Sequence, residues 1–494
     1  MNAIPSEGVP QSICRFSYAT ADITPPVGMY HRMWAASSHD RSEGVHRPLR
    51  AGVMAFAKRV SDSESTDSAT DSANTQLVMT ADHCLLATAT VKGIIDAVSR
   101  ATSLDPRAIH ITFSHTHGVG WIANDRAHHP GGELIEPYLE SLIDTYATLA
   151  QEAHKSLQPA SIVYGTGRCN LAVNRDQWHE PTQQWVIGYN ADVPADDTVM
   201  VARVSSDNDG RTLANIVNYA CHPTTLAWEN RLVSPDYVGA MRETVEDDTG
   251  APCVFLYGAA GELGPRVGFV DDVQVADRNG RQLGLAALSA LITMPPHGTQ
   301  FENPHPVVSG ATLAPWRYAP MPPARHDAVS TWHVKRSTCA LPYRADQRSL
   351  DEVIENRTRL ENARQQARSV GDKTRAADLH AIIEREDRTI SCLEDLPPGD
   401  AYPCETTVLR IGDAIWVSVP GEPYSVLQTT LRDRFDCPIL LMTLSEGWRP
   451  TYLPSEDMYG KGMYTESITL LAPGSLELMI EHVTGQIQRC LECE

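Results

Sequence analysis

The sequence lacks the features that would place it in a membrane or on a nucleic acid. No run of about eighteen apolar residues occurs in its 494 residues, so no transmembrane helix is expected. Positive charge is scarce, because 41 lysines and arginines face 62 aspartates and glutamates, giving a formal net charge of −21. Such an acidic surface repels phosphate backbones and anionic lipids, which argues against nucleic acid as a partner.

The N-terminus and the cysteines indicate a cytoplasmic protein. The chain opens MNAIPSEGVPQSICRF, without the basic start and apolar stretch of a secretory signal peptide, although a misassigned start would hide one. Its eleven cysteines are odd in number and widely scattered, which is typical of reduced and mostly buried thiols. The sequence does not indicate an oligomeric state.

Strand-like and helix-like segments alternate along most of the chain. Apolar strand-like runs occur at 76–82, 109–114, 214–220, 252–258, 414–419 and 438–444. Helix-like runs occur at 86–101, 133–155, 271–293 and 422–435, and a further helix is expected to open at Ser234. This alternation predicts an α/β fold of layered, largely buried strands, without an internal repeat or a clear domain break.

Three segments depart from the alternation. Residues 61–75 are polar and of low complexity, so a solvated loop is expected there. Residues 347–395 carry Leu, Ile and Ala near helical spacing around Gly371, which predicts an inserted helical hairpin broken near that glycine. We interpret its many charges as a solvated face rather than a binding surface. The proline-containing stretch 314–346 is expected to wrap the surface.

Five polar clusters begin where apolar strands stop. They are SHTHG at 114–118, HPTT at 222–225, GAAGELGP at 258–265, PGE at 420–422 and the segment from Tyr452 to Tyr464. In layered α/β folds, ligand sites form beyond the carboxyl ends of the strands. Five clusters at equivalent positions therefore indicate one shared site.

Taken one at a time, these residues leave two interpretations open. Along a continuing strand His115 and His117 would point to one side and bind a metal, but two hydrogen-bonded histidines in a tight turn fit as well. His222, before the strand-ending Pro223, is by itself more typical of a structural histidine. Glu422 is by itself a first-turn carboxylate that a helix dipole favours.

Together the motifs resemble the N-terminal catalytic domain of the neutral/alkaline non-lysosomal ceramidases. The resemblance runs from ADITPP at 21–26 and GVHRPL at 44–49, through the clusters above, to the tyrosine-bearing tail, with matching order and spacing. It implies layered mixed β-sheets flanked by helices, an αββα-like arrangement. It also implies a single catalytic domain over 1–494, in which 347–395 is an insertion.

The resemblance further implies one Zn²⁺ per chain. The implied ligands are His115, His222, Glu422 and Tyr452. Three more residues are implied to be catalytic: His117 lies beside the attacking water, Arg175 faces the substrate, and Tyr464 is a phenol near the substrate. Tyr452 and Tyr464 are 12 residues apart, which matches the tyrosine pair of the family.

This site predicts a zinc-dependent amidohydrolase that acts on a linear, small-molecule or lipid-like amide, ceramide-like N-acyl sphingosines among them. Zinc lowers the pKa of bound water to roughly 7, Arg175 and Tyr464 stabilise the oxyanion, and His117 passes a proton to the leaving amine. Asp82 is a candidate for orienting a histidine, with a strand-end cap as the alternative. A metal-dependent esterase or phosphatase, and a non-catalytic binding protein on the same scaffold, are the other functions considered.

Two features depart from the family pattern. Gly264 stands where the family has a serine near the substrate, so no hydroxyl acts from that position, while the neighbouring Arg266 adds a positive charge that favours a carboxylate-bearing substrate. The chain ends about thirty residues after Tyr464, so the C-terminal sandwich domain of the ceramidases is not expected. Both departures concern the substrate and leave the predicted metal site intact.

Overall fold

The computed structural model describes residues 6–59, 74–303, 305–394 and 396–492. A loop was predicted at 61–75, and its residues 61–73 lie outside the described ranges. Thr75 is the first residue of a strand. The described cysteines form no disulfide and are buried, apart from the half-buried Cys437, as expected for reduced thiols. Among these residues, no helix combines the length and apolarity needed to cross a membrane.

The larger sheet is mixed and contains eight strands within the described ranges. In spatial order these are β14 (Cys253–Tyr257), β12 (Thr212–Tyr219), β11 (Thr198–Ser206), β7 (Gln158–Arg168), β2 (Gln11–Asp22), β4 (Arg50–Ala57), β5 (Thr75–Ala81) and β6 (Ile109–Phe113). The pairs β12–β14 and β5–β6 are parallel, and the other neighbours are antiparallel. The central parts of these strands are buried because both faces of the sheet are covered.

The smaller sheet has four strands in the part of the chain that is described, and it faces the larger one. Its order is β20 (Trp332–Pro342), β21 (Ala401–Ile411), β22 (Ala414–Ser418) and β24 (Ile439–Met442). Apolar side chains of both sheets form a common core, in which the rings of Phe56 and Trp416 lie 5.2 Å apart. The prediction that 314–346 only wraps the surface is wrong for β20, because β21 pairs with it along its whole length.

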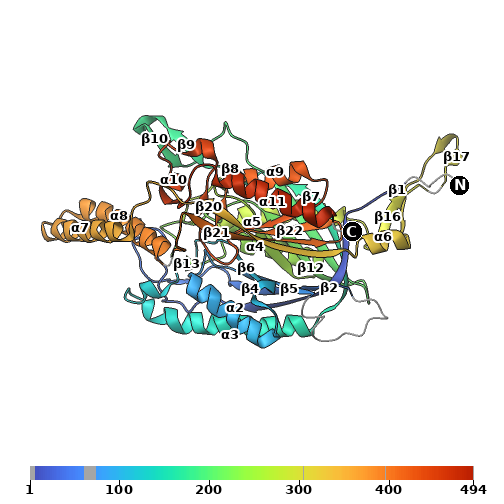
Figure 1. The fold of residues 1–494 in the computed structure, drawn as a ribbon, viewed down its shortest axis with the longest axis horizontal. Helices are drawn as coiled ribbons and strands as arrows, with labels where there is room; N and C mark the ends of the chain where they lie inside the picture. The colour runs from blue at the N-terminus through green and yellow to red at the C-terminus, as the bar shows by residue number, and fades with distance from the viewer. Residues whose placement is uncertain (1–5, 60–73, 304, 395, 493–494) are drawn as a thin grey trace.

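Helices cover the outer faces of both sheets (Figure 1). Those on the larger sheet are α2 (Thr88–Thr102), α3 (Ile135–Lys155), α4 (Tyr237–Thr249) and α5 (Val273–Ile292). Those on the smaller sheet are α9 (Val426–Arg434) and α11 (Ser475–Glu492). In α3 the buried residues recur every three or four positions, which gives the apolar stripe that packs on a sheet. The predicted layered α/β fold is confirmed.

The remaining elements are short. They are β1 (Ser6–Glu7), β3 (Gly44–Val45), β8 (Ala172–Asn174), β9 (Asp176–His179), β10 (Gln184–Ile187), β13 (Leu232–Val233), β15 (Leu263–Pro265), β16 (Thr299–Glu302), β17 (Val307–Ser309), β18 (Ala311–Leu313), β19 (Arg317–Pro320), β23 (Glu422–Pro423), β25 (Tyr452–Leu453), α6 (Pro323–Ala328) and α10 (Tyr464–Ile468). Helix α4 begins later than expected, because Asp236 rather than Ser234 is its N-cap and accepts the Tyr237 N–H at 2.6 Å.

The helical hairpin predicted at 347–395 is present as α7 (Leu350–Ser369) and α8 (Lys373–Leu393). Gly371 lies between the two helices at φ +76°, a conformation that glycine adopts without steric cost. In Figure 1 the hairpin projects from the two-sheet body at the end opposite β17. Its free end is exposed, while its base contacts the loops that surround the candidate site.

The larger sheet curls until its two edge strands meet. β6 and β14 stand at opposite ends of the strand order, yet they contact each other. The segment after β24 joins them, because Glu446 N donates to Ile111 O at 3.0 Å and Thr443 N donates to Tyr257 O at 3.1 Å. The twist between neighbouring strands accumulates across a wide sheet and produces this curl. The loops after β6, β12 and β14 are thereby brought to one place.

Candidate metal site

Three buried side chains converge beyond the ends of β6, β12 and β22. His115 Nε2 and His222 Nε2 lie 3.1 Å and 3.0 Å from the same oxygen of Glu422, Oε2, and no more than 2% of each side chain is exposed. Four ligands at tetrahedral angles and 2.0–2.1 Å from zinc would be separated by roughly 3.3 Å. The spacing of these donor atoms therefore suits one metal ion.

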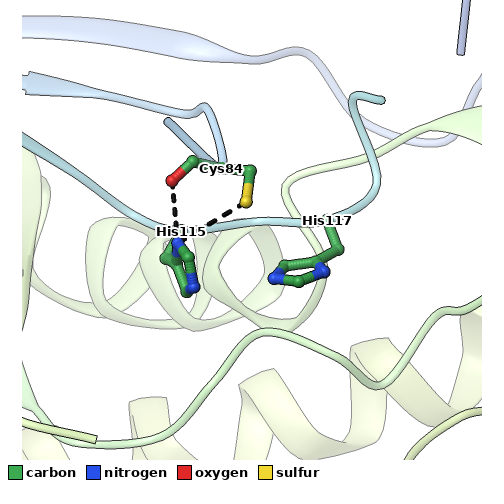
Figure 2. A group of neighbouring side chains, drawn as sticks. All are labelled: Cys84, His115 and His117. Carbon is green, nitrogen blue, oxygen red and sulfur yellow. Dashed lines mark hydrogen bonds between the residues drawn. The ribbon is translucent and has the colours of Figure 1, made fainter. Parts of the chain in front are cut away.

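Hydrogen bonds on the far side of each ring decide which nitrogen faces the site. His115 Nδ1 donates to the carbonyl oxygen of Cys84 at 2.7 Å (Figure 2), and His222 Nδ1 donates to that of Ala260 at 2.7 Å. With Nδ1 protonated, each neutral ring turns the lone pair of Nε2 toward Glu422. Three acceptors that face one another repel unless a cation lies among them, so the donor set fits a metal.

The pKa values of His115, His222 and Glu422 also indicate that the site favours one positive charge. Burial opposes a charged His115 ring, but the sulfur of Cys84 and then the carboxylate of Glu422 outweigh it and raise the His115 pKa well above 6.5. Burial and the Arg175 guanidinium lower the pKa of His222 to about 3. Although burial opposes it, His115 holds the Glu422 pKa well below its usual range. One positive charge is therefore stable here, and a metal ion can replace the proton.

Cys84, His115 and His117 form a second group of possible metal ligands (Figure 2). The Cys84 sulfur lies 3.6 Å from His115 Nδ1. That nitrogen already carries the proton donated to the Cys84 carbonyl, so its lone pair is not available on this side. The group with His222 and Glu422 is therefore the better metal site.

Glu422 lies in a short strand and not, as predicted, at the start of a helix. β23 pairs in parallel with β25, which makes Glu422 and Tyr452 register partners, and Glu422 N donates to Thr451 O at 2.8 Å. Gly421 has φ +73°, and a Cβ on it would lie 2.6 Å from the Thr451 oxygen, so glycine is required there. Helix α9 begins only at Val426.

Tyr452 and Arg175, which the family resemblance implies to be site residues, lie against the same group. Arg175 Nη2 donates to Tyr452 Oη at 3.3 Å, to His222 Nε2 at 3.2 Å and to the Gly261 carbonyl at 2.7 Å. The buried Arg175 Nε has no hydrogen-bond partner among the described residues. Burial and the charge of Glu422 raise the pKa of Tyr452 well above its usual value, although the Arg175 guanidinium opposes this shift.

His117 and Tyr464 border this group. The His117 ring lies 5.0 Å from that of His115, and the Tyr464 ring lies 5.9 Å from that of Tyr452. The predicted continuing strand is wrong, because β6 ends at Phe113 and His115 has φ +65°. Burial and the neighbouring His115 lower the His117 pKa well below its usual value. Its Nε2 has no partner in the described part of the chain.

Asp82 does not orient a histidine, contrary to one of the two roles considered for it. Arg242 of α4 donates to its carboxylate at 3.0 Å, and Arg50 N donates at 2.9 Å. Asp82 thus forms a buried ion pair that joins α4 to the end of β5. The backbone carbonyls of Cys84 and Ala260 orient the histidines instead.

Trp448, which the sequence analysis did not single out, donates from Nε1 to Glu422 Oε1 at 2.6 Å. Replacing it by phenylalanine keeps the ring contact but removes the bond that orients the carboxylate. We expect Trp448→Phe to weaken binding of a metal ion at this site roughly 10- to 100-fold, as seen when such supporting bonds are lost. Competition with a chromophoric chelator measures this affinity.

Trp121→Phe is the matched control. The Trp121 ring packs edge-on against Trp448 at 5.7 Å, and its Nε1 has no hydrogen-bond partner within the described ranges. Removing that N–H should leave the metal affinity unchanged. Equal affinities of the two variants would contradict the role given to Trp448.

A cavity of about 450 Å³ opens directly over the site. His117, Arg175, Tyr452 and Tyr464 form its floor, and its wall is mainly apolar. The large apolar residues of the wall are Met33, Trp34, Ile187, Trp228, Phe269 and Ile468. None of these was predicted; a tryptophan in a loop outside the apolar strands was the only signal that pointed to Trp34 and Trp228.

The helical insertion reaches this cavity, which corrects the interpretation of its charges as only a solvated face. Ala381, Glu384, Arg385 and Arg388 of α8 line the outer part of the cavity. A charge pattern cannot separate a solvated helix face from one that covers a site, because both favour the same residues. The hairpin is therefore part of the candidate site.

Gly264 lies next to Arg175 of the site, whereas Arg266 lies away from the cavity. Gly264 pairs with Val173 in β15–β8, and a Cβ on it would lie 3.5 Å from Arg175 Cδ, so a small side chain would fit there. Arg266 is exposed, stacks on Tyr189 at 5.4 Å and does not line the cavity. Its position does not support the predicted contact with a substrate carboxylate.

Comparisons with known proteins agree with the motifs. Residues 16–254 match the family model described as neutral/alkaline non-lysosomal ceramidase, N-terminal. A search of curated proteins finds no match. The crystal structure of neutral ceramidase from Pseudomonas aeruginosa superposes with a TM-score of 0.62 at 15% identity, covering 97% of this chain and 74% of that chain.

A second solved structure, a ceramidase complexed with C2, superposes with a TM-score of 0.59 at 15% identity, covering 98% of this chain and 76% of that chain. At this identity the likeness shows a common fold. The resemblance inferred from the motifs is thus confirmed: residues 16–254 match the neutral/alkaline non-lysosomal ceramidase family model, and the chain as a whole shares the fold of the solved ceramidases.

Proposed function

We propose that this protein is a zinc-dependent hydrolase that cleaves the amide bond of an apolar N-acyl compound. One observation carries the proposal: two imidazole Nε2 atoms with fixed tautomers face a single oxygen of Glu422 beneath an apolar cavity. The match of residues 16–254 to the ceramidase family supports an amide as the bond that is cleaved. Ceramide-like N-acyl sphingosines are one class within this proposal.

His115, His222 and Glu422 would hold the ion, with Tyr452 as the fourth ligand. Two observations support Tyr452 as a ligand. Glu422 and Tyr452 are register partners in β23 and β25, and Arg175 Nη2 lies within hydrogen-bond distance of both Tyr452 Oη and His222 Nε2. Zinc held by nitrogen and oxygen ligands supplies a Lewis acid and a water that ionises near neutral pH.

Arg175 is the proposed donor to the oxyanion that develops on the substrate carbonyl. Its guanidinium is held in place by the Gly261 carbonyl while its Nε–H remains unpaired among the described residues, which is the preorganisation that such a donor needs. Tyr464, on the cavity floor, is the proposed second donor. His117, kept neutral by burial, would accept a proton and deliver it to the leaving amine.

Metal removal tests this proposal directly. The purified protein should contain about one zinc per chain, and dialysis against a chelator should lower turnover of an N-acyl amide by more than about a hundredfold. Re-added Zn²⁺ should restore it. Metal analysis and amine release by mass spectrometry give the two readouts.

Esters and phosphomonoesters with the same apolar group are measured beside the amide. Turnover of these compounds without any amide hydrolysis would replace the amidase by another metal-dependent hydrolase. A zinc-loaded protein that binds an N-acyl amide and turns over none of the three would instead be a binding protein.

A further inference from the structure

One face of α8 covers the outer part of the cavity over the candidate site. Its four lining residues are Ala381, Glu384, Arg385 and Arg388. They are spaced by three, four and seven positions and so form a single stripe on the helix. Two of them are arginines, although the protein has a formal net charge of −21. The insertion therefore contributes two arginines and one glutamate to the lining of the cavity.

The acidic groups next to Arg385 in the helix are held by other arginines. The pairs are Glu384 with Arg126 at 3.3 Å, Glu386 with Arg348 at 3.0 Å and Asp387 with Arg357 at 2.9 Å. The Arg385 side chain is exposed, and its guanidinium has no hydrogen-bond or ion-pair partner in the described part of the chain. Its guanidinium is thus available to a ligand, and no neighbouring carboxylate neutralises it by direct contact.

The other arginines of the cavity are already engaged. Arg388 donates to the Met33 carbonyl and lies over the Trp121 ring at 5.5 Å. Arg175 is buried on the floor, where its Nη2 atom contacts Gly261 and Tyr452, and its unpaired Nε–H is the donor proposed for the oxyanion of the reacting carbonyl. A substrate carboxylate separate from the reacting carbonyl therefore has Arg385 as its available cationic partner.

We propose that Arg385 determines specificity by binding a carboxylate on the amine side of the scissile amide. The substrate class would be N-acyl amino acids, whose apolar acyl chain packs on Trp34, Trp228 and Phe269 while the carboxylate pairs with the guanidinium. This inference rests on the proposed amidase function and narrows its substrate.

Two amides with the same acyl chain test the inference. An N-acylglycine carries the carboxylate, and the corresponding N-acylethanolamine has a neutral hydroxymethyl group in its place. In Arg385→Gln the KM for the N-acylglycine should rise about 5- to 10-fold with little change in kcat, the size expected for a charge-assisted bond at a partly exposed site. The KM for the N-acylethanolamine should stay the same.

Arg375→Gln is the matched control, because Arg375 is an exposed arginine of the same helix that does not line the cavity. It should leave both KM values unchanged. High salt should reduce the preference of the wild type for the N-acylglycine, since it screens an exposed charge pair. Equal KM shifts on both substrates, or no shift in Arg385→Gln, would overturn the inference.

A third substrate, the monoethanolamide of a dicarboxylic acid, carries its carboxylate at the far end of the acyl chain. A KM rise in Arg385→Gln for this compound alone would overturn the assignment to N-acyl amino acids. If the wild type hydrolyses an N-acyl sphingosine but none of the three amides, only this inference fails; if it hydrolyses no N-acyl amide at all, the proposed amidase function itself fails. Normal hydrolysis with no effect of Arg385→Gln refutes only this inference.

Discussion

Replacing Glu422 by glutamine is expected to abolish metal binding and hydrolysis while the fold is kept. Glutamine has the same shape, so its carbonyl can still accept from Trp448 and its NH₂ can donate to the Nε2 atoms of His115 and His222. The amide cannot supply the negative charge that holds a cation. Zinc content should fall below about 0.1 per chain, and kcat/KM should fall more than about 10³-fold, beyond the loss expected for a supporting residue.

Glu262→Gln is the control for this variant. Glu262 is a buried carboxyl in the loop after β14, where it accepts hydrogen bonds from Ser425 N at 2.8 Å and 2.9 Å. Burial raises the pKa of Glu262 to about 7, so an uncharged amide is a small change there. Normal metal content and activity are expected. Metal analysis showing a full zinc complement in Glu422→Gln would refute the ligand assignment.

Replacing Arg175 by methionine is expected to reduce catalysis without removing the metal. The substitution keeps a similar volume but deletes every hydrogen-bond donor of the Arg175 side chain, while the proposed second donor Tyr464 remains. Loss of one preorganised oxyanion donor lowers kcat by roughly 10²- to 10³-fold, about 2.7–4 kcal/mol in transition-state stabilisation. Steady-state kinetics should show this fall mainly in kcat, while the zinc content stays near one per chain.

Arg266→Met provides the comparison. Arg266 is exposed, stacks on Tyr189 and does not line the cavity, so kcat and KM should both remain near the wild-type values. Arg175→Lys keeps the charge but not the planar fork and should recover only part of the activity. A kcat for Arg175→Met within about tenfold of wild type would show that this guanidinium does not stabilise the transition state.

The sequence by itself determined six strands of the two main sheets (β5, β6, β12, β14, β22 and β24), most of the helices and the identity of the candidate ligands, but not β2, β4, β7, β11, β20 or β21. These predictions depend on local patterns: apolar runs that are buried from both sides, apolar stripes at helical spacing, and polar residues at the points where strands end. The order and spacing of the motifs then selected His115, His222, Glu422 and Tyr452 from among many polar residues. Each of these four now lies within one buried cluster.

Only the tertiary structure decided how these residues meet. The ends of β6 and β12 approach each other because twist accumulates over the whole larger sheet, which no local pattern records. Glu422 lies in a strand because β25, thirty residues later in the chain, pairs with it. Asp82 pairs with Arg242, and α8 covers the cavity, because both contacts join segments far apart in the sequence. Local residue preferences specify individual helices and strands. Which charged side chains pair, and which residues line the cavity, depends on contacts between helices and strands that are distant in the sequence.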